Sequence, residues 1–292
     1  MTLRQRWPLK ALLSFIILEV GLYFVPLPDW WETAVFADYL YSTRIMKVID
    51  IENQYNSMGY RDTEWRQGVR SIAFLGDSRT FGLFVEREET YSEAVERMGD
   101  WQSLNLGVPG ATTFEALDSL VPDALNYEPF AAVVCLDINS SLIGYVPRAQ
   151  ASRRSDVLSN LVRSFSTWVF LEGAWHSFFS ERAPIIPLDD YETQLDLVFQ
   201  RLSEGGVEQN ILVVGWTALE DYPDLYTKAT YDRYRERSRV VALRRGIPIL
   251  EFTEVLKQLP VEDAYIGAHN IHLSPRGHHK LAQAIVSTLD AQ

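Results

Sequence analysis

The stretch VRSIAFLGDSRTFG, from Val69 to Gly82, decides the fold that the sequence predicts. Its first half is a short apolar run ending in glycine, which is typical of a strand buried on both faces of a sheet. Ser78 follows in a Gly-Asp-Ser triplet, so we expect it in the turn between this strand and a helix. Such a serine can cap the helix, or it can act as a nucleophile, because a helix N-terminus stabilises developing negative charge. For the triplet taken alone, a cap is the commoner interpretation.

Strand and helix patterns alternate from Val69 onward. Apolar runs predict strands, and amphipathic or capped segments between them predict helices. Further strands are predicted at 101–107, 130–138, 209–217 and 246–252, and helices at 89–99, 112–125 and 274–289. This alternation predicts an α/β fold, a three-layer α/β/α sandwich with a parallel sheet. In such a sheet, sites form at the carboxyl ends of the strands.

Three other segments place polar or glycine residues after predicted strands or before the last helix. LNLGVPGATT carries Gly107 and Gly110, whose backbone N–H groups can approach a ligand oxygen closely. CLDINSS carries Asn139, and HNIHLSPRGHHKLAQAI carries His272. Taken singly, these are a tight turn, a helix cap or Asx turn, and a surface-loop histidine.

Taken together and in this order, the four blocks resemble the SGNH hydrolase family, also called GDSL-type esterases. The resemblance covers Val69 to Gln292 and implies the SGNH/flavodoxin-like arrangement of the sandwich. It also implies that Ser78 is the nucleophile and His272 the general base. The Gly107 N–H and the Asn139 side chain would then help Ser78's own N–H to bind the oxyanion.

The sequence departs from this family's pattern in two places. The family's third block usually reads Gly-x-Asn-Asp, whereas here it reads Asp137 to Ser140, with the asparagine kept. The family's acid lies three residues before the histidine, and here that position is His269. A backbone carbonyl could orient the imidazole instead, and Glu262 and Asp263 lie just upstream as substitutes.

The resulting expectation is a serine ester hydrolase or an O-acyltransferase that works by two-step acyl transfer. Its substrate would be a small acyl ester or an acylated glycan, and a cell-surface polysaccharide is one candidate. The alternative is a degenerate domain that binds a glycan or a partner protein without turnover, favoured by the histidine at position 269. No cofactor is indicated. A metal site among the C-terminal histidines is disfavoured, because no acidic ligand lies at a clear spacing.

The N-terminus predicts a membrane anchor. Residues 1–10 are basic, residues 11–27 are apolar except for Glu19, and acidic residues follow. A 17-residue helix spans roughly 25 Å, near the lower limit for a bilayer. The charge pattern predicts a cytoplasmic 1–10 segment and a signal anchor at 11–27. The resemblance to membrane-anchored bacterial members implies a single-pass protein of the bacterial cell membrane. A signal peptide cleaved near 35–37 and a buried helix are the alternatives.

The anchored protein would face the periplasm or the exterior. Residues 28–68 form a juxtamembrane segment, and its NSMGYRD stretch resembles one in membrane-anchored bacterial members linked to exopolysaccharide acylation. Exopolysaccharide assembly proteins are therefore candidate partners. The hydrolase-like domain spans 69–292, with a helical insertion at about 148–200. That insertion is a core-packing helix, a lid, or a patch that rests on the membrane.

Composition excludes some functions. The formal net charge is −12, and an acidic surface repels phosphate backbones, so nucleic acid is not an expected partner. Cys135 is the only cysteine, which rules out an intramolecular disulfide and a thiolate cluster for zinc.

Overall fold

The computed structural model describes residues 55–145, 182–215, 228–266 and 272–292. The chain divides into two compact units, of which the larger comprises Ser42–Leu142 and Ile186–Gln292. In the smaller unit the described part is an antiparallel pair, β4 (Ile143–Tyr145) with β5 (Arg182–Pro184). The predicted anchor at 11–27 and most of the predicted insertion lie outside the described residues.

No helix within the described residues is long and apolar enough to cross a membrane.

The larger unit is built on a five-stranded parallel sheet of strand order β2-β1-β3-β6-β7. The strands are β1 (Ser71–Gly76), β2 (Gln102–Gly107), β3 (Ala131–Cys135), β6 (Gln209–Val214) and β7 (Ile249–Glu251). This result confirms the predicted α/β fold with a parallel sheet. The antiparallel pair in the smaller unit is not predicted by the sequence pattern.

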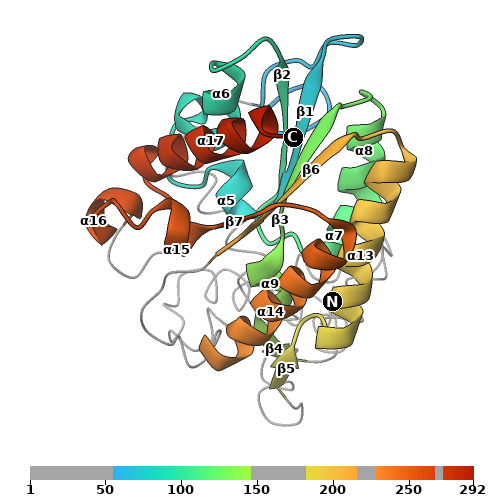
Figure 1. Ribbon diagram of the computed structural model, residues 1–292, viewed down its shortest axis with the longest axis vertical. Coiled ribbons are helices and arrows are strands. Elements are labelled where there is room, and N and C mark those ends of the chain that lie inside the picture. The colour runs from blue at the N-terminus through green and yellow to red at the C-terminus, as the bar shows by residue number, and fades with distance from the viewer. Residues whose placement is uncertain (1–54, 146–181, 216–227, 267–271) are drawn as a thin grey trace, which may run out of the picture. The chain divides into compact units, whose positions relative to one another are not determined.

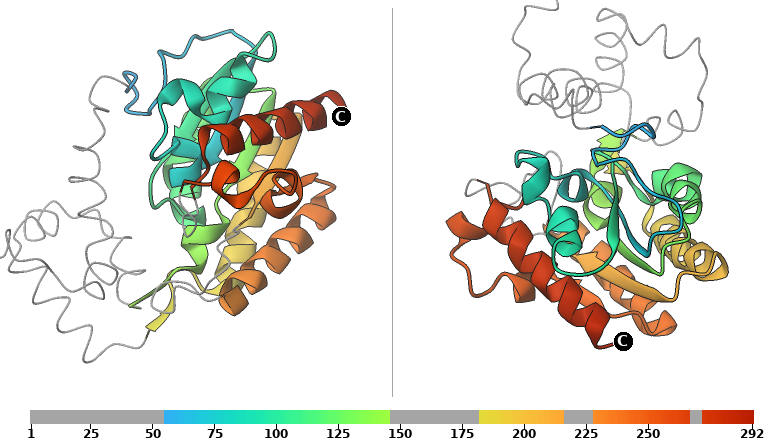
Figure 2. Two further views of the ribbon diagram at one scale, coloured as in Figure 1. Left: turned by 90° about the vertical axis from the view of Figure 1, so that its left-hand side faces the viewer. Right: turned by 90° about the horizontal axis from the view of Figure 1, so that it is seen from above.

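Helices cover both faces of the sheet (Figures 1 and 2). One face is covered by α6 (Tyr91–Glu96) and α17 (Pro275–Asp290), which pack against each other. The other is covered by α8 (Val121–Leu125), α13 (Leu188–Glu204) and α14 (Lys228–Arg245). Every residue of β1 is buried, because its alternate side chains face opposite helix layers.

Shorter elements connect the strands. They are α5 (Ser78–Phe81), the 3₁₀ helix η3 (Arg87–Glu89), α7 (Thr113–Glu115), the π-helical η4 (Ala116–Leu120), α9 (Asp137–Ser141), α15 (Phe252–Val255) and α16 (Val261–Ala264). Thr112 caps α7 through a capping box with Glu115, which confirms the predicted helix start at this position. The π turn precedes Pro122 at the start of α8, where proline cannot supply a backbone N–H.

The strand register aligns the carboxyl ends of the three neighbouring strands β2, β1 and β3. Gly76 lies opposite Gly107 on one side and opposite Cys135 on the other. The segments that follow these residues therefore begin at one edge of the sheet, which is where a site is expected.

Gly107 lets β2 approach the short helix α5 closely. A Cβ atom at this position would lie 2.1 Å from the backbone nitrogen of Phe81. Gly110 differs, because a Cβ atom there would meet no other atom within 4 Å, although its left-handed φ of +84° favours glycine.

We expect Gly107→Ala to lower the free energy of unfolding by about 3 kcal/mol or more, because the collision is with backbone that must move. Gly110→Ala should cost only about 1 kcal/mol, from the conformation alone. Urea unfolding followed by circular dichroism measures both. Equal losses would show that the close approach of β2 and α5 is not a packing constraint.

Candidate active site

Ser78 is the first residue of α5 and follows β1 with one residue between them. The N-cap of the helix is Asp77, whose carboxylate accepts a hydrogen bond from the Arg79 N–H at 2.9 Å. The cap is therefore provided by the residue before Ser78. The Ser78 hydroxyl is left for another partner.

That partner is His272. The Ser78 Oγ and His272 Nε2 atoms lie 2.9 Å apart, and the two residues are 7% and 4% exposed. His272 lies just before α17, in a segment held by the bridge between Tyr265 and Leu273 and by the hydrogen bond from the Ile266 N–H to the His272 carbonyl. These two residues are 194 positions apart in the sequence, and the fold brings them together at the carboxyl edge of the sheet.

The surroundings of His272 keep its imidazole neutral. Burial lowers the pKa of His272 to about 3, and the positive charge of Arg79 contributes in the same direction. A neutral imidazole can accept the proton of a serine hydroxyl, so the pair has the form of a nucleophile and its base.

The two predicted oxyanion donors have protein partners. The side-chain amide of Asn139, a buried residue of α9, donates to the Ala111 carbonyl at 3.2 Å. The Gly107 N–H donates to the Asn105 side chain at 3.0 Å, so it would have to leave this bond to meet a ligand. Gly110 is exposed, and among the described residues no acceptor is bonded to its N–H.

Among the residues considered for orienting the His272 imidazole, His269 lies outside the described residues. The Asp263 carboxylate accepts from the Arg276 guanidinium at 2.6 Å, in a pair that is largely open to solvent. Within the described part of the chain, no group of three or more histidine, cysteine, aspartate or glutamate side chains could hold a metal ion.

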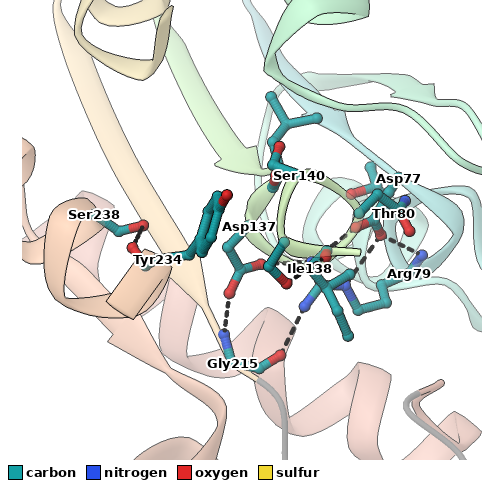
Figure 3. Close-up of polar contacts among 12 residues, drawn as sticks. Asp77, Arg79, Thr80, Asp137, Ile138, Ser140, Gly215, Tyr234 and Ser238 are labelled. Atoms are coloured by element: carbon teal, nitrogen blue, oxygen red, sulfur yellow. Dashed lines mark hydrogen bonds and ion pairs between the residues drawn. The ribbon is translucent and has the colours of Figure 1, made fainter. Parts of the chain in front are cut away.

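A buried charge cluster lies directly beside Ser78, and the sequence interpretation missed it. The guanidinium of Arg79 is fully buried and pairs with Asp77 at 2.8 Å and with Asp137 at 2.6 Å (Figure 3). It also donates to the Gly215 carbonyl at 2.7 Å. The Asp137 carboxylate in turn accepts from the Gly215 N–H at 3.0 Å and from the Tyr231 hydroxyl.

This cluster joins the ends of β1, β3 and β6, which lie side by side in the sheet. The sequence held a signal for it: Asp137 replaces the glycine of the third block, and an arginine follows the Gly-Asp-Ser triplet. Opposite charges at the carboxyl ends of two strands are expected to pair once those strands are neighbours. The aspartate at position 137, which departs from the family's pattern, is thus explained by its ion pair with Arg79.

The segment before β1 supports the site from the far side of β2. Asp62 is buried and accepts hydrogen bonds from the Asn105 N–H and from the Trp65 indole, both at 2.7 Å. Burial raises the pKa of Asp62 to about 7, although these donors act against the increase. Asn105 also donates to the Ser92 hydroxyl at 3.0 Å. The NSMGYRD stretch is thereby attached to the strand that ends at Gly107.

Comparison with known proteins shows which family the chain resembles in sequence. A sequence model of the GDSL-like lipase/acylhydrolase family matches residues 74–280. This match includes Ser78, Asn139 and His272. No curated protein sequence matches the chain at a significant level.

Solved structures with the same fold are distant in sequence. A lipase/acylhydrolase from Enterococcus faecalis is 19% identical with a TM-score of 0.53, and the match covers 76% of this chain and 96% of that one. A protein from Desulfitobacterium hafniense, described as lipolytic and of the G-D-S-L family, is 16% identical with a TM-score of 0.51, over 75% and 98% of the two chains. At these identities the likeness concerns the fold.

We expect Arg79→Met to lower the free energy of unfolding by about 3–5 kcal/mol, because it leaves two carboxylates buried without their cation. Lys257→Met is the matched control, since it removes a cation from the solvent-exposed pair with Glu254 and should leave stability unchanged. Chemical denaturation of both variants at neutral pH provides the comparison. A stability close to that of the unmodified protein for Arg79→Met would mean that the cluster carries little of the stability of this edge.

Proposed function

The chain belongs to the GDSL-like lipase/acylhydrolase family and is a hydrolase that acts on esters, and we propose that it does so with Ser78 as nucleophile and His272 as general base. The observation that carries this proposal is the 2.9 Å contact between the Ser78 hydroxyl and the His272 Nε2 atom. A serine hydroxyl is a weak nucleophile until a base takes its proton, and here that base is already within hydrogen-bonding distance.

The reaction proceeds in two steps. Ser78 Oγ attacks the ester carbonyl while His272 Nε2 takes its proton, and the protonated imidazole then passes this proton to the departing alkoxide. The acyl group remains on Ser78. Water, deprotonated by His272, attacks the acyl-enzyme, and the proton returns to Ser78 as the carboxylic acid leaves.

Backbone and side-chain donors stabilise the oxyanion of both steps. The Ser78 N–H lies at the start of α5, and the Asn139 amide is the side-chain donor. For the third donor we propose the Gly110 N–H in place of the Gly107 N–H, because the only N–H of Gly107 is bonded to Asn105, whereas the Asn139 amide has a second N–H besides the one bonded to Ala111. Each fixed donor is worth about 3 kcal/mol of the barrier.

The acceptor and the compartment are parts of the same proposal. A sugar hydroxyl in place of water would make the protein an O-acyltransferase, and the NSMGYRD resemblance favours an O-acylated cell-surface polysaccharide as substrate and assembly proteins as partners. The basic residues before 11–27 and the acidic residues after it support a membrane-anchored domain that faces the periplasm or exterior.

A second candidate function is binding without turnover. It is favoured by the histidine at position 269, where the family has its acid, because an imidazole without an orienting carboxylate can adopt the wrong tautomer. Such a domain would hold an acylated glycan or a partner protein.

Ser78→Ala and His272→Ala should each lower kcat on a p-nitrophenyl ester by at least about 10⁴-fold. A fluorophosphonate probe should label the unmodified protein and fail to label Ser78→Ala. Ser203→Ala and His279→Ala are matched controls, because both residues are exposed, and they should retain activity. If the unmodified protein shows no more ester hydrolysis than Ser78→Ala and His272→Ala, and no probe labels it, the binding function replaces the enzymatic one.

The membrane topology is tested separately. A reporter that is active only in the periplasm, fused after Gln292, should be active in whole cells, whereas a reporter active only in the cytoplasm should be silent. The opposite pattern would overturn the proposed compartment. A mature N-terminus near position 38 would retain the compartment and remove the anchor.

A further inference from the structure

Phe84 has an unfavourable backbone conformation close to the site. Its φ is +72°, in the left-handed region that a bulky residue rarely adopts, and the residue is 39% exposed. Strain of this kind persists only where the surroundings impose it, and it concentrates at functional sites.

A buried arginine imposes this conformation on the turn after α5. Arg61 donates to the carbonyls of Phe81 at 3.2 Å, Gly82 at 2.7 Å and Val85 at 2.8 Å. Its guanidinium also lies over the Phe81 ring, 5.2 Å from the centroid. Arg61 thus binds the carbonyls on both sides of Phe84, so the residue between them has little freedom to relax.

Two backbone bonds tie the same turn to the nucleophile. The Leu83 N–H donates to the Ser78 carbonyl at 3.0 Å, and the Gly82 N–H donates to the same carbonyl. Gly82 ends α5 with a φ of +75°. The position of Phe84 is therefore fixed relative to Ser78 through only a few covalent and hydrogen bonds.

The ring of Phe84 packs on His272. The two ring centroids lie 5.1 Å apart with an interplanar angle of 82°, which is the edge-to-face arrangement that aromatic pairs prefer. His272 Nε2 also contacts Ser78 Oγ. The imidazole thus contacts both the nucleophile and an aromatic ring that belongs to the same short segment as the nucleophile.

We propose that Phe84 is a positioning residue, whose strained, Arg61-fixed turn holds its ring against the His272 imidazole and keeps Nε2 aimed at Ser78. This inference rests on the proposed function, because it concerns the base of that reaction. It gives the NSMGYRD stretch a role at the site, since Arg61 belongs to that stretch.

The Phe84 ring covers part of the His272 imidazole, because the two rings pack edge to face. Among the described residues, the groups that bear on the ionisation of this histidine include Arg79, the Ser78 hydroxyl and His278, whose pKa is lowered in part by His272. Burial is the main cause of the low pKa of His272. Loss of the Phe84 ring would admit water and raise the pKa of His272 toward its ordinary value of about 6.5. Because the base must be neutral to act, the fall of kcat/KM at acid pH should then begin at a higher pH.

The first experiment replaces the ring. Phe84→Leu, which keeps apolar bulk, should lower kcat on a p-nitrophenyl ester about tenfold with KM within about twofold, since an imidazole that is aimed less well transfers its proton less often. Phe84→Tyr keeps the ring, so its kcat should stay within about twofold of that of the unmodified protein. Leu243→Ala, at an exposed position of α14, is the control and should behave as the unmodified protein.

The second experiment separates strain from packing. Phe84→Ala and Phe84→Gly both remove the ring, but only glycine relieves the left-handed conformation. Both should have the same reduced kcat, while Tm should be higher for Phe84→Gly by about 2–4 °C. A structural role alone would instead make activity follow stability across the two variants.

A third readout does not depend on turnover. The pKa of His272, followed by NMR of its ring protons, should rise in Phe84→Leu and stay low in Phe84→Tyr. An unchanged kcat in Phe84→Leu, a rise in KM alone, or an unchanged His272 pKa would each overturn the positioning role. Ser78→Ala, assayed in the same series, separates the two proposals. If it remains active, the proposed function fails. If it is inactive while Phe84→Leu matches the unmodified protein, only the role of Phe84 fails.

Discussion

The buried guanidinium of Arg79 is the constraint on which the active edge of the sheet depends. A buried cation is tolerated only when carboxylates surround it, so Asp77 and Asp137 must lie at the ends of two neighbouring strands. Because Asp77 also caps α5, the same carboxylate that pairs with Arg79 releases the Ser78 hydroxyl from capping. The contact of Ser78 with His272 follows from this arrangement.

Much of the fold could be predicted because buried parallel strands have a strong local pattern. The runs that end at Gly76 and Cys135 are apolar on both faces, which few other structures require, whereas the run that ends at Gly107 alternates apolar and polar residues. The proximity of Ser78 and His272 could be expected from the order of the blocks, while their catalytic roles stay predictions. The cap at Asp77 could not be separated from a cap at Ser78, because two adjacent residues of similar capping preference compete there.

What the sequence could not supply were contacts whose partners lie far apart along the chain. The Arg79–Asp137 pair, 58 positions apart, depends on β1 and β3 being neighbours. Phe84 is a stronger case, because no local preference favours a phenylalanine at positive φ. The three hydrogen bonds from Arg61, which lies well upstream in the sequence, explain its conformation.

The distance along the chain between Ser78 and His272 also bears on when activity first arises. His272 precedes α17, and this helix packs on α6 to complete one layer of the sandwich. During synthesis, the nucleophile emerges 194 residues before its base. The ribosome releases the segment that carries His272 only after the five strands of the sheet, so under the proposed mechanism Ser78 gains its base only once the C-terminal part of the chain has emerged.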